Sequence, residues 1–220
     1  MLDLDLYEAK ALYPFQEKTV TSILAEFESN DVNFNLLYQL PTGGGKTVIF
    51  SEIARRYIEK FGKKVLILTH RIELSVQTSK QLSAINVNNK VISSDVKTLD
   101  KDEQFNCYIA MVETLNNRLR DNENFIEGVG LVIVDEAHYN SFRKIFQYYE
   151  QANILGVTAT PLSSNKALPL NDNYNKLLVG ECISSLIENG YLSDAETFHS
   201  EQFRSSIREL FYAGKITFCL

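Results

Sequence analysis

A glycine-rich segment contains the residues best suited to bind phosphate. Residues 39–47 read QLPTGGGKT, follow an apolar run and open a helical pattern. Consecutive glycines let backbone N–H groups approach phosphate oxygens, and the start of a helix adds a favourable dipole. Lys46 can then reach the terminal phosphates, and the Thr47 hydroxyl can bind Mg²⁺. The predicted ATP-binding residues of this segment are Thr42, Gly43, Gly44, Gly45, Lys46 and Thr47.

The same segment has one alternative interpretation. The usual phosphate-loop pattern has glycine where this chain has Leu40, and glycine turns before helices are common. A purely structural turn would explain the glycines but would assign no role to Lys46.

Two carboxylates follow a second apolar run. Residues 131–135 (LVIVD) are typical of a buried strand, and Glu136 and His138 come directly after it. Because the carboxyl ends of parallel strands meet at one edge of a sheet, Asp135 is predicted to hold Mg²⁺ and Glu136 to orient or deprotonate a water molecule. The predicted catalytic residues are Glu136, Lys46 and His138. The alternative, that Asp135 caps the next helix, leaves Glu136 and His138 unexplained.

Other hydrolytic chemistries do not match the residue spacing. His70 and His199 do not stand at H-x₃-H or H-E-x-x-H spacing with His138 or with each other, which excludes a zinc hydrolase site. The chain also lacks the G-x-S-x-G sequence of a serine nucleophile elbow.

Short apolar runs alternate with helical patterns, which predicts an α/β fold with a mostly parallel sheet and helices on both faces. A polar loop is expected over residues 162–174. The expected strands are residues 34–40, 64–69, 91–93, 107–112, 131–135 and 154–158, and the expected helices are residues 47–60, a segment ending near 82, one starting at 115, 139–149 and 182–191.

Composition limits the class of protein and the compartment in which it is expected. With 220 residues, 45% apolar residues and a net charge of -6, the chain is an ordinary globular domain without a uniformly basic surface, although a local basic stripe is compatible. Three widely spaced cysteines, Cys107, Cys182 and Cys219, favour a reducing compartment. Neither a signal peptide nor a membrane span is recognisable, so a cytoplasmic location and no membrane partner are expected.

Taken together, the motifs resemble the first RecA-like lobe of superfamily 2 helicases and translocases, which are P-loop NTPases. The matching segments are PTGGGKT, a strand that ends Thr69-His70-Arg71, the DEAH box and GVTATP, at residues 41–47, 64–71, 135–138 and 156–161. Residues 69–74 and 186–192 make the chain most similar to the DNA-repair and type I/III restriction branch. The resemblance covers about residues 12–198.

This resemblance implies ATP and Mg²⁺ as cofactors and nucleic acid as a partner, DNA in preference to RNA. It implies that Gln16, in the segment LYPFQ, bonds the adenine edge, although Tyr13 stands where many relatives have arginine. His138 with Thr158 and Thr160 would couple the nucleotide state to lobe movement. The implied contacts to a nucleic-acid backbone are Thr69, His70, Arg71 and Thr114; the alternative is that His70 and Arg71 only end a strand.

The resemblance also implies a division of the chain. Residues 1–198 would form the N-terminal ATP-binding lobe, and residues 199–220 a C-terminal appendage. This appendage resembles a remnant of a second lobe; the alternative is a C-terminal helix and strand that belong to this domain. Motors of this superfamily pair two lobes, and the second supplies an arginine finger, so a second lobe or a protein partner acting in trans is expected. The alternatives are a nucleotide-binding interaction module with little turnover and the motor lobe of a restriction complex.

Overall fold

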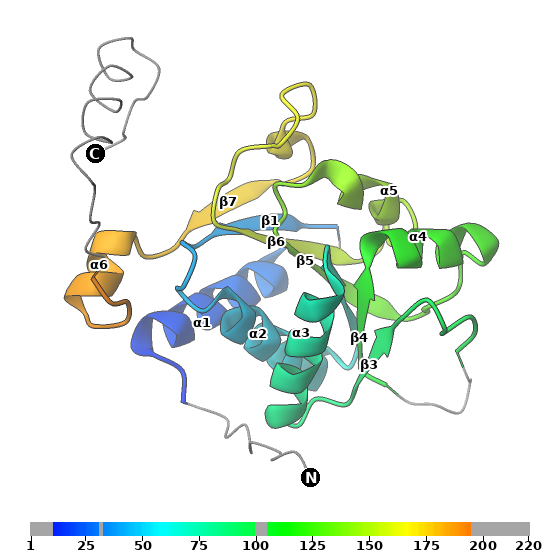
Figure 1. The fold of residues 1–220 in the computed structure, drawn as a ribbon, viewed down its shortest axis with the longest axis horizontal. Helices are drawn as coiled ribbons and strands as arrows, with labels where there is room; N and C mark the ends of the chain where they lie inside the picture. Colours follow the sequence, from blue (N-terminus) through cyan, green and yellow to red (C-terminus); the bar gives the residue numbers. More distant parts are fainter. Residues whose placement is uncertain (1–10, 31–32, 100–104, 195–220) are drawn as a thin grey trace, which may run out of the picture.

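Seven parallel strands form a single sheet in the computed structural model, which describes residues 11–30, 33–99 and 105–194 (Figure 1). The order across the sheet is β3-β4-β2-β5-β6-β1-β7. Because every neighbouring pair is parallel, all carboxyl ends lie at one edge of the sheet. The strands are β1 (Asn35–Gln39), β2 (Lys64–Thr69), β3 (Asn89–Ile92), β4 (Cys107–Met111), β5 (Val129–Asp135), β6 (Asn153–Thr158) and β7 (Lys176–Val179).

Helices cover both faces of the sheet. The helices α1, α2 and α3 lie on one face, and α4 and α5 lie on the other (Figure 1). In the described ranges, none of the helices is long and apolar enough to cross a membrane. The helical elements are α1 (Pro14–Ser29), α2 (Lys46–Phe61), α3 (Ile72–Ala84), α4 (Val112–Asp121), η1 (Asn140–Phe142), α5 (Arg143–Phe146), η2 (Leu170–Asp172) and α6 (Ile183–Glu188).

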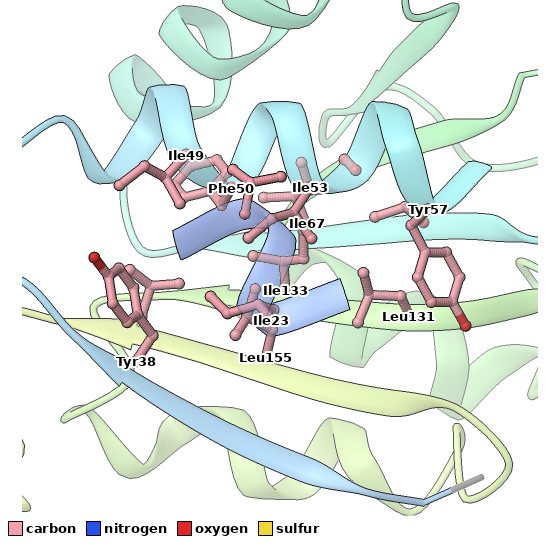
Figure 2. Close-up of a cluster of buried hydrophobic side chains, with 14 of the residues drawn as sticks. Ile23, Tyr38, Ile49, Phe50, Ile53, Tyr57, Ile67, Leu131, Ile133 and Leu155 are labelled. Carbon is pink, nitrogen blue, oxygen red and sulfur yellow. The ribbon is translucent and has the colours of Figure 1, made fainter. Parts of the chain in front are cut away.

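Alternating strand residues supply two separate cores. In β5, Leu131 and Ile133 belong to the cluster under α1 and α2, whereas Val132 and Val134 belong to the cluster under α4 and α5. Figure 2 shows the first cluster, in which Ile53 of α2 packs above the strands. Each fully buried aliphatic side chain contributes about 1.5–3 kcal/mol. Burial on both faces explains why these strands are continuous apolar runs.

The structure confirms the predicted fold class and corrects parts of the element assignment. The helix expected over residues 139–149 is a 3-10 turn followed by the four-residue helix α5. The helix α1 and the strand β7 were not predicted; β7 is a short edge strand whose Leu177 and Val179 remain exposed. The predicted appendage at residues 199–220 lies outside the described residues, as do His199 and Cys219.

Candidate functional site

The turn between β1 and α2 has the backbone of an anion cradle. Gly43 and Gly45 both have φ of +86°, a left-handed conformation that suits glycine. A Cβ on Gly45 would lie 2.5 Å from Gln16 Nε2, so a side chain does not fit there without movement. No side chain caps the first turn of α2, which begins at Lys46. The amides at this helix start are therefore suited to bind phosphate oxygens.

Lys46 and Thr47 occupy the first two positions of α2. The Lys46 ammonium donates a hydrogen bond to the Leu40 carbonyl at 3.4 Å, and its positive charge acts on Asp135, where it partly opposes the rise in pKa that burial causes. The backbone N–H of Leu40 in turn donates to the Thr158 carbonyl at 3.0 Å. The loop is thus tied to the end of β6, on the side where Asp135 lies.

Asp135 ends β5 as a buried carboxyl group. Burial, followed by the nearby negative charge of Glu136, raises the pKa of Asp135 to about 6, against the opposing effects of Lys46 and the Glu136 N–H. That N–H donates to Asp135 Oδ1 at 3.0 Å. A carboxylate whose charged form is destabilised in this way is stabilised by a bound cation, so the residues here fit Mg²⁺.

Glu136 follows in a left-handed conformation that is uncommon for a residue with a side chain. Its φ is +54°. The turn is held on both sides, because the Glu136 N–H bonds the Asp135 carboxylate and the Ala137 N–H donates to the Val157 carbonyl at 3.0 Å. Strained backbone that is held by its surroundings is a feature of functional sites.

His138, Thr158 and Thr160 meet in one hydrogen-bond network. His138 Nδ1 lies 3.0 Å from Thr158 Oγ1 and 3.4 Å from Glu136 Oε2. The Thr158 hydroxyl donates to the Thr160 carbonyl at 2.9 Å, so its oxygen is an acceptor toward His138. Both neighbours of Nδ1 accept there, and this network assigns the ring proton to Nδ1. The three predicted coupling residues are therefore brought together beside Glu136.

The predicted nucleic-acid residues separate into two groups, one packed against neighbouring side chains and one accessible. Thr69 is fully buried with its hydroxyl 2.7 Å from Ser75 Oγ, so this side chain does not reach a surface ligand. The His70 ring packs edge-on against Tyr139 and Phe142, and its Nε2 is buried without a hydrogen-bond partner. Burial, followed by the charge of His138, lowers the pKa of His70.

Arg71 and Thr114 remain accessible. Arg71 is exposed at the start of α3, and Thr114 is half-buried in the first turn of α4. Both follow the carboxyl ends of neighbouring strands, β2 and β4.

Beside the glycine loop lie Gln16, which the sequence assigned, and Leu192, which it did not. Gln16 is buried, and its Oε1 accepts a hydrogen bond from the Tyr13 N–H at 3.0 Å. A Cβ on Gly43 would lie 2.7 Å from Leu192 Cδ2, so the segment after α6 touches the glycine loop. More than 140 residues separate Gly43 from Leu192 in the sequence, and no spacing rule connects them.

A cavity elsewhere in the described part of the chain does not involve these residues. A cavity of about 730 Å³ opens at the opposite edge of the sheet, beside Lys64, Tyr108 and Arg118, and contains none of the predicted site residues. A phosphate cradle built from loop amides is exposed by construction, so cavity volume is a poor guide to this site.

Comparisons with known proteins agree with this geometry. Residues 9–163 match the family described as type III restriction enzyme, res subunit. The Saccharomyces cerevisiae protein IRC3, which is named as an ATP-dependent helicase, is 29% identical over 206 residues, covering 86% of this chain and 29% of IRC3. The ATP-dependent DNA helicase Hel308 of Pyrococcus horikoshii is 29% identical over 164 residues, covering 68% of this chain and 22% of Hel308.

A solved structure gives the same fold. The Pyrococcus furiosus Hef helicase domain superposes with a TM-score of 0.60 at 23% identity, covering 91% of this chain and 45% of that one. This chain spans less than a third of the length of IRC3 and Hel308.

The fold and the site together define the ATP-binding, first RecA-like lobe of a superfamily 2 helicase. Within that class, the chain belongs to the family of the type III restriction enzyme res subunit.

Proposed function

We propose that this chain binds Mg²⁺–ATP and hydrolyses it in a cycle coupled to nucleic-acid binding. The observation that supports this most directly is the convergence of Lys46, Asp135 and Glu136 at one edge of the sheet, beside the left-handed glycine loop. Residues 41–47 act as the Walker A loop and residues 135–138 as the Walker B strand end and DEAH box. The helicase names of IRC3 and Hel308 support the same activity.

Each residue of the site has a specific task. The backbone of the loop (Thr42, Gly43, Gly44 and Gly45) cradles the phosphates, and Lys46 neutralises their charge. Thr47 and Asp135 hold Mg²⁺, which neutralises charge on the transferred phosphoryl group. Gln16 faces the base. No other part of the described structure combines these groups.

Hydrolysis depends on Glu136. Its carboxylate orients the attacking water and accepts a proton from it, which is a general-base contribution of about 10²–10⁴-fold. His138 lies between Glu136 and Thr158, so a movement at Thr158 or Thr160 shifts the position of the Glu136 carboxylate. This network is how the nucleotide state is coupled to lobe movement.

Nucleic acid binds at the same edge of the sheet, through Arg71 and Thr114. We favour DNA, as Hel308 is named a DNA helicase. The chain is acidic overall, but a local contact to a few phosphates is compatible with that charge. Arg71→Ala is expected to weaken binding of a DNA duplex of any sequence and to lower the salt slope by about one unit. An unchanged slope would show that Arg71 is only a surface residue.

The chain acts as one lobe of a larger motor. We place the ATP-binding lobe at residues 1–198 and an appendage at residues 199–220, and a second lobe or a partner in trans supplies the arginine finger. A finger of this kind is worth about 10³–10⁵-fold in rate. The isolated chain is therefore expected to hydrolyse ATP slowly. Separately, we assign the protein to the cytoplasm.

The test is ATP binding and turnover by the purified chain and its Lys46→Ala variant, with and without DNA or RNA. The parent is expected to bind a fluorescent ATP analogue and the variant to lose that binding, with the fold unchanged by circular dichroism. Equal binding by both proteins would reject the cradle. Binding without any turnover, even with added nucleic acid, would instead identify a nucleotide-binding interaction module.

A further inference from the structure

Three aromatic rings from distant parts of the chain are packed in series beside the glycine loop. Tyr13 and Tyr191 have ring centroids 4.6 Å apart, and Tyr191 and Phe15 have centroids 5.0 Å apart. In Figure 1, α6, which precedes Tyr191, lies next to the first turn of α1. Phe15 is buried, whereas Tyr13 is 49% exposed. The series therefore has an inner end in the core and an outer end open to solvent.

The outer ring is connected to the phosphate loop by short contacts. The Tyr13 N–H bonds Gln16 Oε1, and Gln16 Nε2 lies against Gly45. On the other side of the series, Leu192 lies against Gly43. The Tyr13–Tyr191 pair is thus joined to both left-handed glycines of the loop.

The position of Tyr191 is defined by the backbone. The N–H groups of Tyr191 and Leu192 both donate to the Leu186 carbonyl, at 2.8 and 3.0 Å, and Gly190 has φ of +72°. Leu186 is fully buried, so this turn is anchored in the core. Tyr191 is half-buried between Phe15 and Tyr13, and its ring limits the orientations open to the Tyr13 ring.

We propose that Tyr191 is a positioning residue of the nucleotide site, and that it holds the Tyr13 ring as the surface on which the nucleotide base stacks. This inference rests on the proposed function. A half-exposed aromatic ring, held from behind and joined to a phosphate cradle, is suited to the planar face of a nucleobase. Every base has such a face, so the stack contributes affinity, and discrimination between bases depends on polar groups such as the Gln16 amide.

The test compares a ligand that has a base with one that lacks it. Dissociation constants for ATP and for inorganic tripolyphosphate, each with Mg²⁺, are measured by calorimetry on the parent, Tyr191→Ala, Tyr191→Phe and Tyr13→Ala. Loss of base stacking typically weakens binding by about tenfold. We expect that loss for ATP in Tyr191→Ala and Tyr13→Ala, with tripolyphosphate unchanged, and parent-like ATP binding in Tyr191→Phe.

Two controls separate the possible outcomes. Tyr148→Ala removes another half-buried tyrosine, near the amino end of β5, and is expected to leave both constants unchanged. Lys46→Ala is expected to weaken both ligands. If Tyr191→Ala weakened ATP and tripolyphosphate equally, or weakened neither, the positioning role would be wrong while the proposed function stood. If the parent itself bound no ATP, the proposed function would fail. Should Tyr191→Ala not fold, Tyr13→Ala tests the stacking surface that Tyr191 is proposed to hold, and ATP binding equal to that of the parent would overturn the proposal.

Discussion

Two turns at the same edge of the sheet achieve left-handed backbone by different means. The loop after β1 has its left-handed positions at Gly43 and Gly45, where the conformation costs little. The turn after β5 has a left-handed position at Glu136, which carries a side chain, and compensates through hydrogen bonds from Glu136 N–H and Ala137 N–H. The first turn is encoded locally, and the second depends on its surroundings.

The difference follows from what each turn presents. A phosphate cradle offers backbone amides, so side chains would only obstruct it. In the proposed mechanism the turn after β5 presents a carboxylate at a defined point, and a glycine there would remove that group. Strain at Glu136 is therefore retained with the chemistry, whereas the loop avoids strain altogether.

The largest expected effect separates the two turns by function. Glu136→Gln keeps the shape of the side chain and the backbone of the turn but removes the proton acceptor. Hydrolysis is expected to fall about 10²–10⁴-fold while the ATP dissociation constant stays near that of the parent. Single-turnover rates and equilibrium binding check this. Parent-like turnover would remove Glu136 from the mechanism.

The second effect is a pH dependence of stability caused by Asp135. Its pKa is about 6 in the folded protein and near 3.8 when unfolded, so the folded state binds more protons between these pH values, and stability falls as pH rises through that window. One pKa unit corresponds to about 1.4 kcal/mol. Above pH 6 the charged Asp135 carboxylate therefore lowers the free energy of unfolding by about 2–3 kcal/mol.

Asp135→Asn tests that cost. Urea unfolding without Mg²⁺ or nucleotide is expected to give equal stabilities for variant and parent near pH 4 and a variant more stable by about 2–3 kcal/mol near pH 8. Taking the difference between the two proteins removes the contribution of all other titrating groups. A difference independent of pH would contradict the raised pKa of Asp135.

The smallest effect is a pair of substitutions with opposite signs. Gly45→Ala forces a side chain into a left-handed position beside Gln16 and is expected to destabilise the fold by about 1–2 kcal/mol. At position 136, glycine adopts the left-handed conformation without strain, whereas alanine does not. Glu136→Gly is therefore expected to be more stable than Glu136→Ala by about 1 kcal/mol, because the greater freedom of glycine in the unfolded chain offsets part of the gain. Thermal unfolding of the variants measures both changes in stability. If the two changes had the same sign, the two turns would not differ as described.

The sequence predicted those parts of the site that depend on local chemistry. Glycines before a helix and acids after an apolar run are local signals, and Lys46, Asp135 and His138 were proposed as site residues from them. The burial of the Thr69 side chain could not be predicted, because it depends on Ser75 of the next helix, which no spacing rule reveals. Tyr191 was not assigned to the site, because its contact with Tyr13 is purely tertiary.

The same division applies to the fold. The apolar runs of β2, β5 and β6 were visible because both faces of these strands are buried. The order of strands was not predictable from local pattern: β6 lies between β1, which precedes the glycine loop, and β5, which ends at Asp135.

That strand order has a consequence for the synthesis of the protein. β1 lies between β6 and β7 in the sheet, and Gln39 is paired with Thr158 of β6, which is 119 residues later in the chain. At about 5–20 residues per second, a ribosome needs roughly 6–24 s to make the intervening segment. For that time the nascent β1 is an unpaired apolar strand, a species prone to aggregation and suited to chaperone binding. The catalytic edge is therefore among the last parts of the lobe to be assembled during translation.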